Sequence, residues 1–354
     1  MTKQRIENLQ KYLLKHNIEL FIVDNPIDLY YLTGLHLSTG RLLISQNNSC
    51  LFVDLRYLER VKIHSSIQSA LLSEQNILDF VSKDILTLTF DAEATSYASY
   101  LSLKQQFSTK NLQPSEISPV KALRSIKDSE EKTKLRNAGL LCSKGYDFVL
   151  TLLKEGISEK QVATSLEIFW KEQGADALSF EPIIAFGKNS SMPHYKASTT
   201  TLKKGDIVLI DIGVTLECYA SDMTRTIFFG TPDPLLQKAY FVVLEAQQEA
   251  LSLCKKGALI SSLNAKATEV ITNHGFKDSI RHGIGHGIGL EVHELPFLKD
   301  ASNTRCLEED MAITIEPGIY LDGIGGIRIE NSVLIKEDSY EDLTKRDTDI
   351  FVMK

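Results

Sequence analysis

Residues 205–230 read GDIVLIDIGVTLECYASDMTRTIFFG, and this stretch decides the fold of the second half of the chain. Two runs rich in β-branched and other apolar residues, 206–212 and 219–229, flank a turn region near 214–218. Runs of this kind on either side of a short turn are typical of neighbouring antiparallel strands. The stretch therefore predicts a hairpin.

Each predicted strand carries a carboxylate among apolar residues. Val208 and Ile210 share one face of the first strand by the period of two, whereas Asp211 lies on the other face, at the end of the strand. Asp222 lies on the second strand, and a hairpin of this length can bring it beside Asp211. A single acidic residue on a strand is usually just solvated. Two neighbouring carboxylates, however, repel each other unless a proton or a cation lies between them.

Two further acids repeat this pattern nearer the C-terminus. Glu316 ends a β-branched run in MAITIEPGIY (311–320), just before a Pro-Gly turn. In GGIRIENSVLI (325–335), Glu330 shares a face with Arg328, while the isoleucines that alternate with them point the other way.

Three histidines lie close to these acids in HGIGHGIGLEVHE (282–294), namely His282, His286 and His293. The glycines between them permit close approach of the backbone. A lone histidine is more often a structural residue than a ligand. Three within a short glycine-rich segment indicate a site instead.

The charges in this set favour bound metal. Asp211, Asp222, Glu316 and Glu330 together carry four negative charges, which two divalent cations would neutralise. Oxygen-rich ligands with one imidazole suit manganese, cobalt, iron or catalytic zinc, and the thiolate set of a structural zinc site is missing. Two metals about 3.5–4 Å apart can share a hydroxide, whose pKa they lower toward about 7. The residues themselves thus predict a dinuclear metallohydrolase and leave its substrate open.

The composition is that of an ordinary globular protein and excludes several other classes. With 354 residues the chain is long enough for two domains, and its formal charge of −7 argues against nucleic acid as a partner. No stretch approaches the ~20 apolar residues of a membrane helix, so we expect no membrane partner. Five cysteines without a C-x-x-C pair favour reduced thiols in a cytoplasmic protein.

The periodicity changes along the chain. The front alternates helical segments with short apolar strands, which indicates an α/β layer, and a poorly periodic stretch with two prolines at 111–127 marks a boundary. Behind it, separate runs of helices and antiparallel strands indicate an α+β domain. In front we expect a helix at 3–16 and strands at 19–23, 41–46 and 50–54. Behind we expect helices at 128–156, 158–174, 234–257 and 261–274, and strands at 206–212, 219–229, 311–316 and 326–335.

The motifs, taken in order, resemble the pita-bread metallopeptidases of the creatinase, aminopeptidase P and prolidase group. They are DIG with SDMTRT, GHGIGLEVHE, TIEPG and GGIRIEN, and DLYYLTG (28–34) and DLRY (54–57) are similar to the smaller front domain of this group. The resemblance implies a creatinase-like α/β domain at 1–120, a linker at 121–127 and a pita-bread catalytic domain at 128–354.

The resemblance also assigns metal ligands. Asp211 would chelate one metal, Asp222 and Glu330 would bridge both, and His286 and Glu316 would complete the second. Two divalent ions are implied, Mn²⁺ first, with Co²⁺ or Zn²⁺ as alternatives. Glu316 would exchange a proton with the bridging hydroxide as it attacks the scissile carbonyl.

Other residues gain roles in the same way. His194 matches a histidine that contacts substrate near the scissile bond, and His293 matches one that polarises the carbonyl. His282 matches a histidine that lines the site without binding metal. Arg328 and Thr224 resemble residues that orient the carboxylate ligands.

The implied substrate is a peptide with proline in its second position. Phe186, Tyr195 and Phe297 are candidate walls for the proline ring, with an ordinary core or surface role as the alternative for each. Many relatives read P-H-H where this chain has Pro193-His194-Tyr195.

Strict dipeptidases of the group often carry an arginine four residues after the H-E histidine, which here is Phe297, although Lys299 or a residue from elsewhere can replace that anchor. We therefore expect an Xaa-Pro aminopeptidase, with the Xaa-Pro dipeptidase (prolidase) as the alternative and a homodimer as an implied possibility.

Three rivals share the fold. A methionine aminopeptidase normally lacks a front domain, whereas this chain has about 120 residues before the linker. A creatinase-like hydrolase works without metal. A non-catalytic binding module would have lost ligands, and all five ligand positions are retained here.

Overall fold

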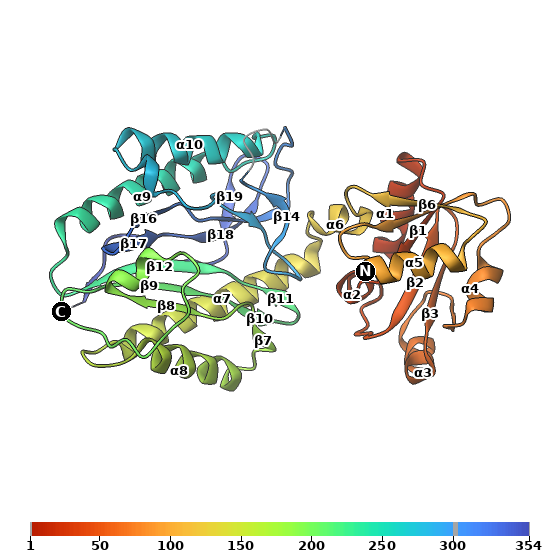
Figure 1. The fold of residues 1–354 in the computed structure, drawn as a ribbon, viewed down its shortest axis with the longest axis horizontal. Coiled ribbons are helices and arrows are strands. Elements are labelled where there is room, and N and C mark those ends of the chain that lie inside the picture. Colours follow the sequence, from red (N-terminus) through yellow and green to blue (C-terminus); the bar gives the residue numbers. More distant parts are fainter. Residues whose placement is uncertain (1, 300–303, 354) are drawn as a thin grey trace. The chain divides into compact units, whose positions relative to one another are not determined.

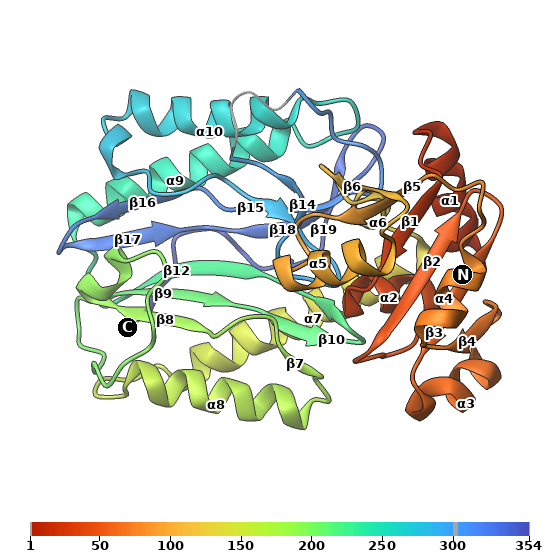
Figure 2. The ribbon, with the colours of Figure 1, turned by 45° about the vertical axis from the view of Figure 1, so that its right-hand side comes forward.

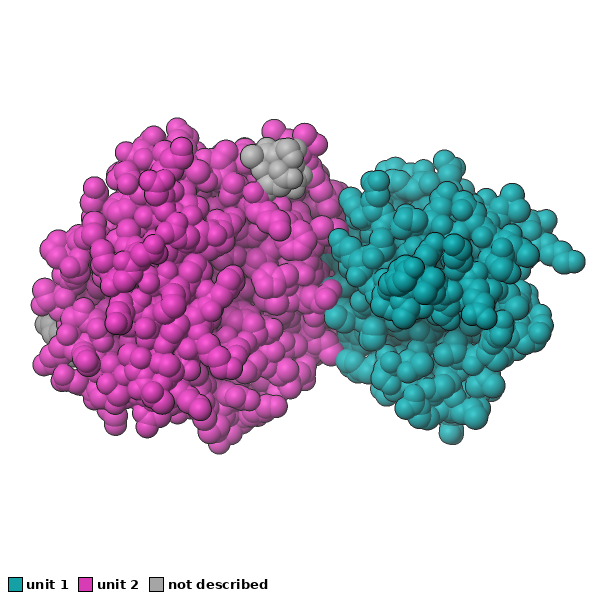
Figure 3. Space-filling model, viewed as in Figure 1, with its two compact units in different colours: residues 1–124 teal, residues 125–354 magenta. Residues whose placement is uncertain are grey.

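A computed structural model describes residues 2–299 and 304–353. The chain divides into two compact units, residues 1–124 and 125–354, coloured separately in Figure 3. The division falls within the segment 121–127. Among the described residues, no helix combines the length and the apolar character needed to cross a membrane.

The N-terminal unit is built on a six-stranded mixed sheet with the strand order β4-β3-β2-β1-β5-β6. Parallel pairing joins β1 to β5, β5 to β6 and β3 to β4, whereas β2 is antiparallel to both of its neighbours. The strands are β1 (Leu20–Val23), β2 (Gly40–Ser45), β3 (Ser49–Val53), β4 (Ser69–Leu71), β5 (Thr87–Asp91) and β6 (Asn111–Ser115).

Six helices accompany this sheet: α1 (Thr2–Lys15), α2 (Pro26–Thr33), α3 (Leu55–His64), α4 (Glu74–Phe80), α5 (Tyr97–Gln106) and α6 (Pro119–Arg124). The helix and the three strands expected in this part are all present, and a core that includes Ile22, Phe52 and Leu88 fills the unit. The poorly periodic stretch 111–127 holds β6 and α6, so residues 121–124 of the expected linker are helical.

Four helices frame the C-terminal unit: α7 (Ser129–Leu152), α8 (Glu159–Glu172), α9 (Pro234–Ser252) and α10 (Ile260–Asn273). Both expected capping boxes form, because Asp128 and Glu131 exchange hydrogen bonds at the start of α7, as do Ser158 and Gln161 at the start of α8. Asp233 caps α9 directly before its first-turn proline.

The strands between these helices form several sheets. One has the order β20-β12-β9-β8 and another β14-β13-β15-β18-β19, with smaller sheets β11-β10-β7 and β16-β17 beside them. The first comprises β8 (Ile183–Phe186), β9 (Ile207–Ile212), β12 (Met223–Phe229) and β20 (Val352–Met353). The second comprises β13 (His286–Gly287), β14 (Glu294–Phe297), β15 (Ala312–Ile315), β18 (Asn331–Ile335) and β19 (Tyr340–Asp342). The smaller sheets hold β7 (Ala177–Leu178), β10 (Val214–Leu216), β11 (Tyr219–Ala220), β16 (Gly318–Leu321) and β17 (Gly325–Arg328).

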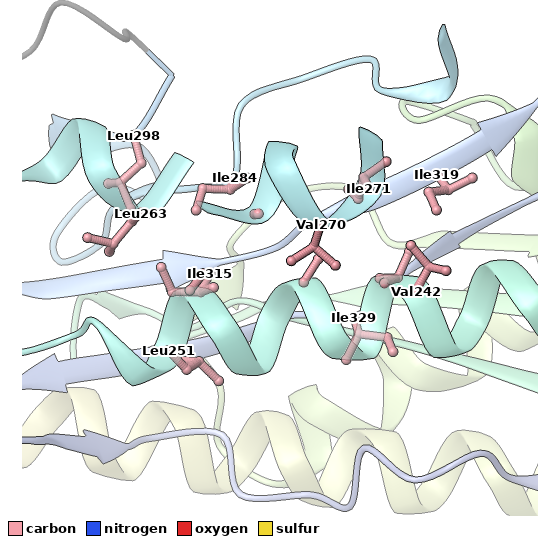
Figure 4. Packing of buried hydrophobic residues seen from close by; sticks show 14 of the residues in the cluster. Val242, Leu251, Leu263, Val270, Ile271, Ile284, Leu298, Ile315, Ile319 and Ile329 are labelled. Carbon is pink, nitrogen blue, oxygen red and sulfur yellow. The ribbon is translucent and has the colours of Figure 1, made fainter. Parts of the chain in front are cut away.

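Helices cover the strands of this unit from two sides (Figures 1 and 2). On one side α7 and α8 pack on β8, β9 and β12 around a core that includes Trp170, Ile210 and Ile227. On the other side α9 and α10 pack on β15 to β18. Figure 4 shows side chains of this second core. Among them are Val242 and Leu251 of α9, Leu263 and Val270 of α10, and Ile315 and Ile329 from the strand segments that these helices cover.

The predicted fold class is confirmed, with one local difference that matters for function. The expected strands 219–229 and 326–335 are each broken, into β11 and β12 and into β17 and β18. Both breaks occur where the chain leaves one sheet for another. Asp222 lies at the first break and Glu330 at the second.

Candidate active site

One wall of the site comes from the sheet that contains β9 and β12. Asp211 is the penultimate residue of β9, and the antiparallel register sets it directly opposite Thr224 of β12. Ile210 and Met223 point into the core beneath α7 and α8, so the alternation of the strands turns Asp211 and Thr224 to the opposite face. Asp222 precedes β12 and shares that face with Thr224.

The other residues come from the second sheet and from β17. His286 begins β13, Glu316 directly follows β15, and Glu330 lies between β17 and β18. The backbone N–H of Glu330 donates to the carbonyl of Thr224 at 3.0 Å, which fastens this break to β12. Ile327 and Ile329 belong to the core beneath α9, so Arg328 and Glu330 face the site as their alternation predicts.

Three of these side chains meet closely enough to share one cation. Single ligand atoms of Asp222, His286 and Glu330 all lie within 4.8 Å of one another. His286 Nε2 is also 3.3 Å from Glu316 Oε1 and 3.7 Å from Asp222 Oδ2. The Nδ1 atom of His286 donates to the carbonyl of Gly287 at 3.1 Å, and this bond orients the ring so that Nε2 faces the carboxylates.

Burial and mutual repulsion raise the pKa of the carboxyl groups at this point. Burial is the main cause of the raised pKa of Asp222, and the neighbouring carboxylates of Glu330 and Asp211 add to it. The pKa of Glu330 is raised for the same reason, burial first and then the carboxylates of Glu316 and Asp211. Burial likewise raises the pKa of Asp211, against the opposing charge of Arg328. The cluster therefore favours a positive ion among its oxygens.

Glu316 behaves differently from the other three acids. Burial acts to raise its pKa, but the hydrogen bond and charge of His286, with His282 and Arg328, lower it overall. The hydroxyl of Thr314 also approaches Glu316 Oε1 at 3.3 Å. Glu316 is thus the acid of the cluster whose surroundings best support an ionised carboxylate.

Two buried oxygens of the cluster have no hydrogen-bond partner among the described residues: Asp211 Oδ1 and Glu330 Oε1. Buried polar atoms without a partner are costly, so such atoms are expected to face a ligand. Their position beside Asp222 and His286 matches a divalent-ion site. The donor set, four carboxylates and one imidazole, fits the metal implied by the sequence.

A hydrogen-bonded network around Arg328 holds the ligand candidate Asp211 in place. The guanidinium of Arg328 contacts Asp211 Oδ2 and the hydroxyl of Tyr320, and its Nε donates to Thr224 Oγ1 at 3.1 Å. Tyr320 in turn lies 2.7 Å from Nε2 of His282. Arg328 is 3% exposed, which excludes the surface role that an arginine on a strand often has.

The ligand candidates and most of the other expected site residues line one cavity of about 540 Å³. Nine of the ten residues expected from the sequence line it, while the tenth, Thr224, is fully buried. The nine are His194, Asp211, Asp222, His282, His286, His293, Glu316, Arg328 and Glu330. The rings of His286 and His293 lie 4.3 Å apart, and burial followed by the charge of His286 lowers the pKa of His293.

The aromatic walls suggested by the sequence separate into two groups. Tyr195 and Phe297 line the cavity. The expectation for Phe186 is wrong, because its side chain is 2% exposed and packs in the core beneath α7 and α8. Phe186 ends β8, and the inward face of that strand accounts for its burial.

Two lysines also reach the cavity, Lys196 and Lys299. Lys196 is paired with Glu181 at 2.9 Å. Lys299 lies 5.5 Å above the ring of Phe297 and forms no ion pair with another residue that the structure describes. A Cβ on Gly283 would come within 2.5 Å of Lys299 Cβ, so glycine there permits the close approach of Lys299 to the His282 segment.

The sequence alone did not identify Tyr320 as part of the site. Its place two residues after the Pro-Gly turn that follows Glu316 is the only local signal. Its role in the network depends on the pairing of β16 with β17, which sets Gly318 opposite Arg328 and brings Tyr320 within reach of the guanidinium.

Comparison with known families gives two matches that together span most of the chain. Residues 133–337 match the model of metallopeptidase family M24. Residues 5–126 match the creatinase/prolidase N-terminal domain.

Individual relatives extend over the full length. The chain is 33% identical to the Xaa-Pro dipeptidase of Pyrococcus furiosus over 98% of this chain and 99% of that protein. Its fold is similar to the Xaa-Pro dipeptidase of Bacillus anthracis, with a TM-score of 0.94, 31% identity and complete coverage of both chains. It is also similar to the X-Pro aminopeptidase of Thermotoga maritima, with a TM-score of 0.85 and 32% identity over 95% of this chain and 98% of that one.

Proposed function

Because the chain belongs to metallopeptidase family M24 and carries a creatinase/prolidase N-terminal domain, we propose that it is an Xaa-Pro dipeptidase. It would hydrolyse the bond before proline in dipeptides. Relatives named as Xaa-Pro dipeptidases match nearly the whole chain and favour this activity over the aminopeptidase expected from Phe297. The homodimer stays a prediction.

The proposed metal ligands are Asp211, Asp222, His286, Glu316 and Glu330, with Asp222 and Glu330 shared between two ions. The partnerless oxygens of Asp211 and Glu330 support this assignment. When bound, two divalent ions supply Lewis-acid activation of water and of the scissile carbonyl. Oxygen-rich ligands favour Mn²⁺, with Co²⁺ or Zn²⁺ as alternatives.

The chain's own groups would then orient substrate and move protons. Glu316 would take a proton from the attacking water at a carboxylate oxygen and pass it to the leaving proline nitrogen. His293 would donate to the carbonyl oxygen, where negative charge develops. His194 would contact substrate beside the scissile bond. Tyr195 and Phe297 would flank the proline ring, since both line the cavity.

The observation that carries the dipeptide assignment is Lys299. In an Xaa-Pro dipeptide the proline bears the terminal carboxylate, so the binding site needs a cation close to the cleaved bond. Lys299 lines the cavity that holds the ligand candidates, and it forms no ion pair with another described residue. Its ammonium would bind the carboxylate as a point charge, without the two-pronged geometry of an arginine.

An Xaa-Pro aminopeptidase is the second candidate. Phe297 stands where strict dipeptidases often carry an arginine, and the Thermotoga maritima X-Pro aminopeptidase has a similar fold. That enzyme class must accept a chain that continues beyond proline, and an apolar side chain with 40% exposure at this position is compatible with that.

The test compares Ala-Pro, Ala-prolinamide and Ala-Pro-Ala in the presence of Mn²⁺. A charge-assisted contact is worth about 1.5–3 kcal/mol, so Ala-Pro should exceed the amide by about 10- to 100-fold in kcat/KM. Lys299→Met should remove most of that difference. The matched control is Lys238→Met, since Lys238 lies 5.4 Å above the ring of Phe276 and outside the cavity. Faster cleavage of Ala-Pro-Ala than of Ala-Pro would establish the aminopeptidase instead.

A further inference from the structure

Glu159, at the first turn of α8, is fully buried although it is a carboxylate. Its side chain accepts five hydrogen bonds from a segment 27 to 39 residues further along the chain. Oε1 accepts from the backbone N–H of Phe186 at 2.8 Å and from the amide of Asn189 at 2.9 Å. Oε2 accepts from the hydroxyl of Tyr195 at 2.8 Å and from Ser198, through N at 3.0 Å and Oγ at 2.7 Å.

These partners are all donors and none of them is a cation. An ionised carboxylate is a pure acceptor, which matches a ring of donors. The N-terminus of α8, a helix of 14 residues, adds a favourable dipole. A buried carboxylate with this many donors fixes the positions of the groups that donate to it, because every broken bond leaves a buried polar group unpaired.

The segment that Glu159 holds carries His194 to the cavity. It leaves β8 at Phe186, passes through a short 3-10 turn (Gly187–Ser191) and returns toward β9. His194 lines the cavity, is exposed, and makes no hydrogen bond with another described residue. Its position therefore depends on its neighbours in the chain.

Tyr195, the residue after His194, connects His194 to Glu159. Its ring packs on Ile183 and Ala185 of β8 and on Leu209 of β9. Its hydroxyl donates to Glu159 and accepts from Asn189 at 2.8 Å. The ring and the hydroxyl together fix the residue that follows His194.

We infer that Glu159 is a positioning residue that holds segment 186–198, and with it His194, at the edge of the cavity. Its own oxygens do not reach the cavity, so it acts through Tyr195, Asn189 and Ser198. The kinetic test of this inference rests on the proposed function. The structural test, which measures hydrogen exchange, does not.

The start of α8 is also held by hydrogen bonds that do not involve the side chain of Glu159. Glu159 N donates to Thr200 O at 3.0 Å, Lys160 N donates to Ser198 O at 2.9 Å, and Leu202 N donates to Ile157 O at 2.8 Å. The capping box of Ser158 and Gln161 also forms without the Glu159 side chain. Glu159→Gln turns one of the two acceptor oxygens into an amide donor, so it removes the hydrogen bonds to that oxygen and leaves this backbone docking available.

The structural test compares Glu159→Gln and Tyr195→Phe with Glu167→Gln as a matched control. Glu167 lies on the exposed face of the same helix. Amide hydrogen exchange over residues 186–200 should accelerate in Glu159→Gln, and less so in Tyr195→Phe, which loses one of the five bonds and keeps its ring. Bound metal should stay at wild-type level. Equal acceleration throughout α7 and α8 would overturn the inference in favour of a general folding role.

The kinetic test is a double-mutant cycle on Ala-Pro cleavage. Glu159→Gln should lower kcat/KM about 10- to 100-fold, the usual size of an error in substrate positioning. In a His194→Ala background the same substitution should lower kcat/KM by a clearly smaller factor, because His194 is gone and Tyr195 is the one proposed substrate contact that Glu159 still holds. Additive effects would overturn the inference. A wild-type protein that fails to cleave Ala-Pro would reject the proposed function alone, since hydrogen exchange still tests the role of Glu159.

Discussion

The hydroxyl of Thr224 donates to Glu330 Oε2 at 2.6 Å and accepts a hydrogen bond from Arg328 Nε at 3.1 Å. Thr224 is fully buried and lies opposite Asp211 in the β9–β12 ladder. One small hydroxyl thus fixes a carboxylate that we propose as a metal ligand and the guanidinium that contacts another.

Thr224→Val should weaken metal binding without removing a ligand. The substitution leaves Glu330 Oε2 and Arg328 Nε without a partner, and loss of a group that orients a ligand typically costs about 10- to 100-fold in metal affinity. Titration of the metal-free protein with Mn²⁺ measures the change. Thr164→Val, at an exposed position of α8, is the control and should bind Mn²⁺ as the wild type does. Equal affinities in all three proteins would show that Thr224 does not orient Glu330.

Metal binding should release protons and strengthen as pH rises. Burial and neighbouring carboxylates raise the pKa of Asp222 and Glu330 in the metal-free protein, so its folded state keeps protons that the unfolded chain has lost. The free energy of unfolding of the metal-free protein should therefore fall as pH rises from the ordinary carboxyl range toward these raised values. Divalent ions must displace the retained protons.

Calorimetric titration at pH 6 in two buffers of different ionisation enthalpy counts the protons released. Asp222→Asn, which has no proton to release at that position, should release fewer and bind less metal. An identical heat of Mn²⁺ binding in both buffers would contradict the expected proton release.

His286 and His293 should give opposite results when replaced by alanine. His286→Ala should abolish binding of at least one ion, since Nε2 of His286 faces both Asp222 and Glu316. His293→Ala should keep the metal content and lower kcat by about 10²- to 10³-fold, the usual loss for one group that stabilises a developing negative charge. Metal analysis alongside steady-state kinetics separates the two. Metal loss in His293→Ala with retention in His286→Ala would reverse their assignment.

Lys127→Met should strongly destabilise the C-terminal unit. Lys127 and Glu294 form a buried ion pair at 3.1 Å, with side chains 0% and 5% exposed. Removing one partner of such a pair typically costs about 3–5 kcal/mol, because the other charge stays buried. Glu294 adjoins His293, so activity should fall as well.

Urea unfolding at saturating metal measures this change. Lys196→Met, which breaks the exposed pair with Glu181, is the control and should change the unfolding free energy by less than about 1 kcal/mol. Similar midpoints for Lys127→Met and wild type would show that the pair contributes little.

Local signals predicted the helices well and the strand breaks poorly. The capping residues Asp128 and Ser158 place the starts of α7 and α8 correctly. The helix expected to reach Gly156 ends at Leu152, because the backbone is extended at Leu153, and Gly156 lies in the following turn with φ of +88°. The breaks beside Asp222 and Glu330 depend on which sheet each segment joins. Hydrophobic periodicity predicts which face of a strand is buried, but it does not predict which sheet the strand joins.

The family resemblance is confirmed, and the motif residues expected in the site meet in one cavity apart from the buried Thr224. Side chains that position other site residues through hydrogen bonds are harder to predict from the sequence. Tyr320 and Glu159 owe their positions to packing between distant segments, and neither has a distinctive local pattern. Phe186 was wrong as a wall residue for the same reason, since only the packing of β8 shows that it faces the core.

The breaks in the two long strands have a mechanical consequence. Asp211 lies on β9 and Asp222 directly before β12, in one sheet region. His286, Glu316 and Glu330 come from β13, the end of β15 and the break between β17 and β18. An ion held by both groups would therefore cross-link residues that come from two different sheets. We therefore expect bound metal to make this unit more resistant to heat and to denaturant.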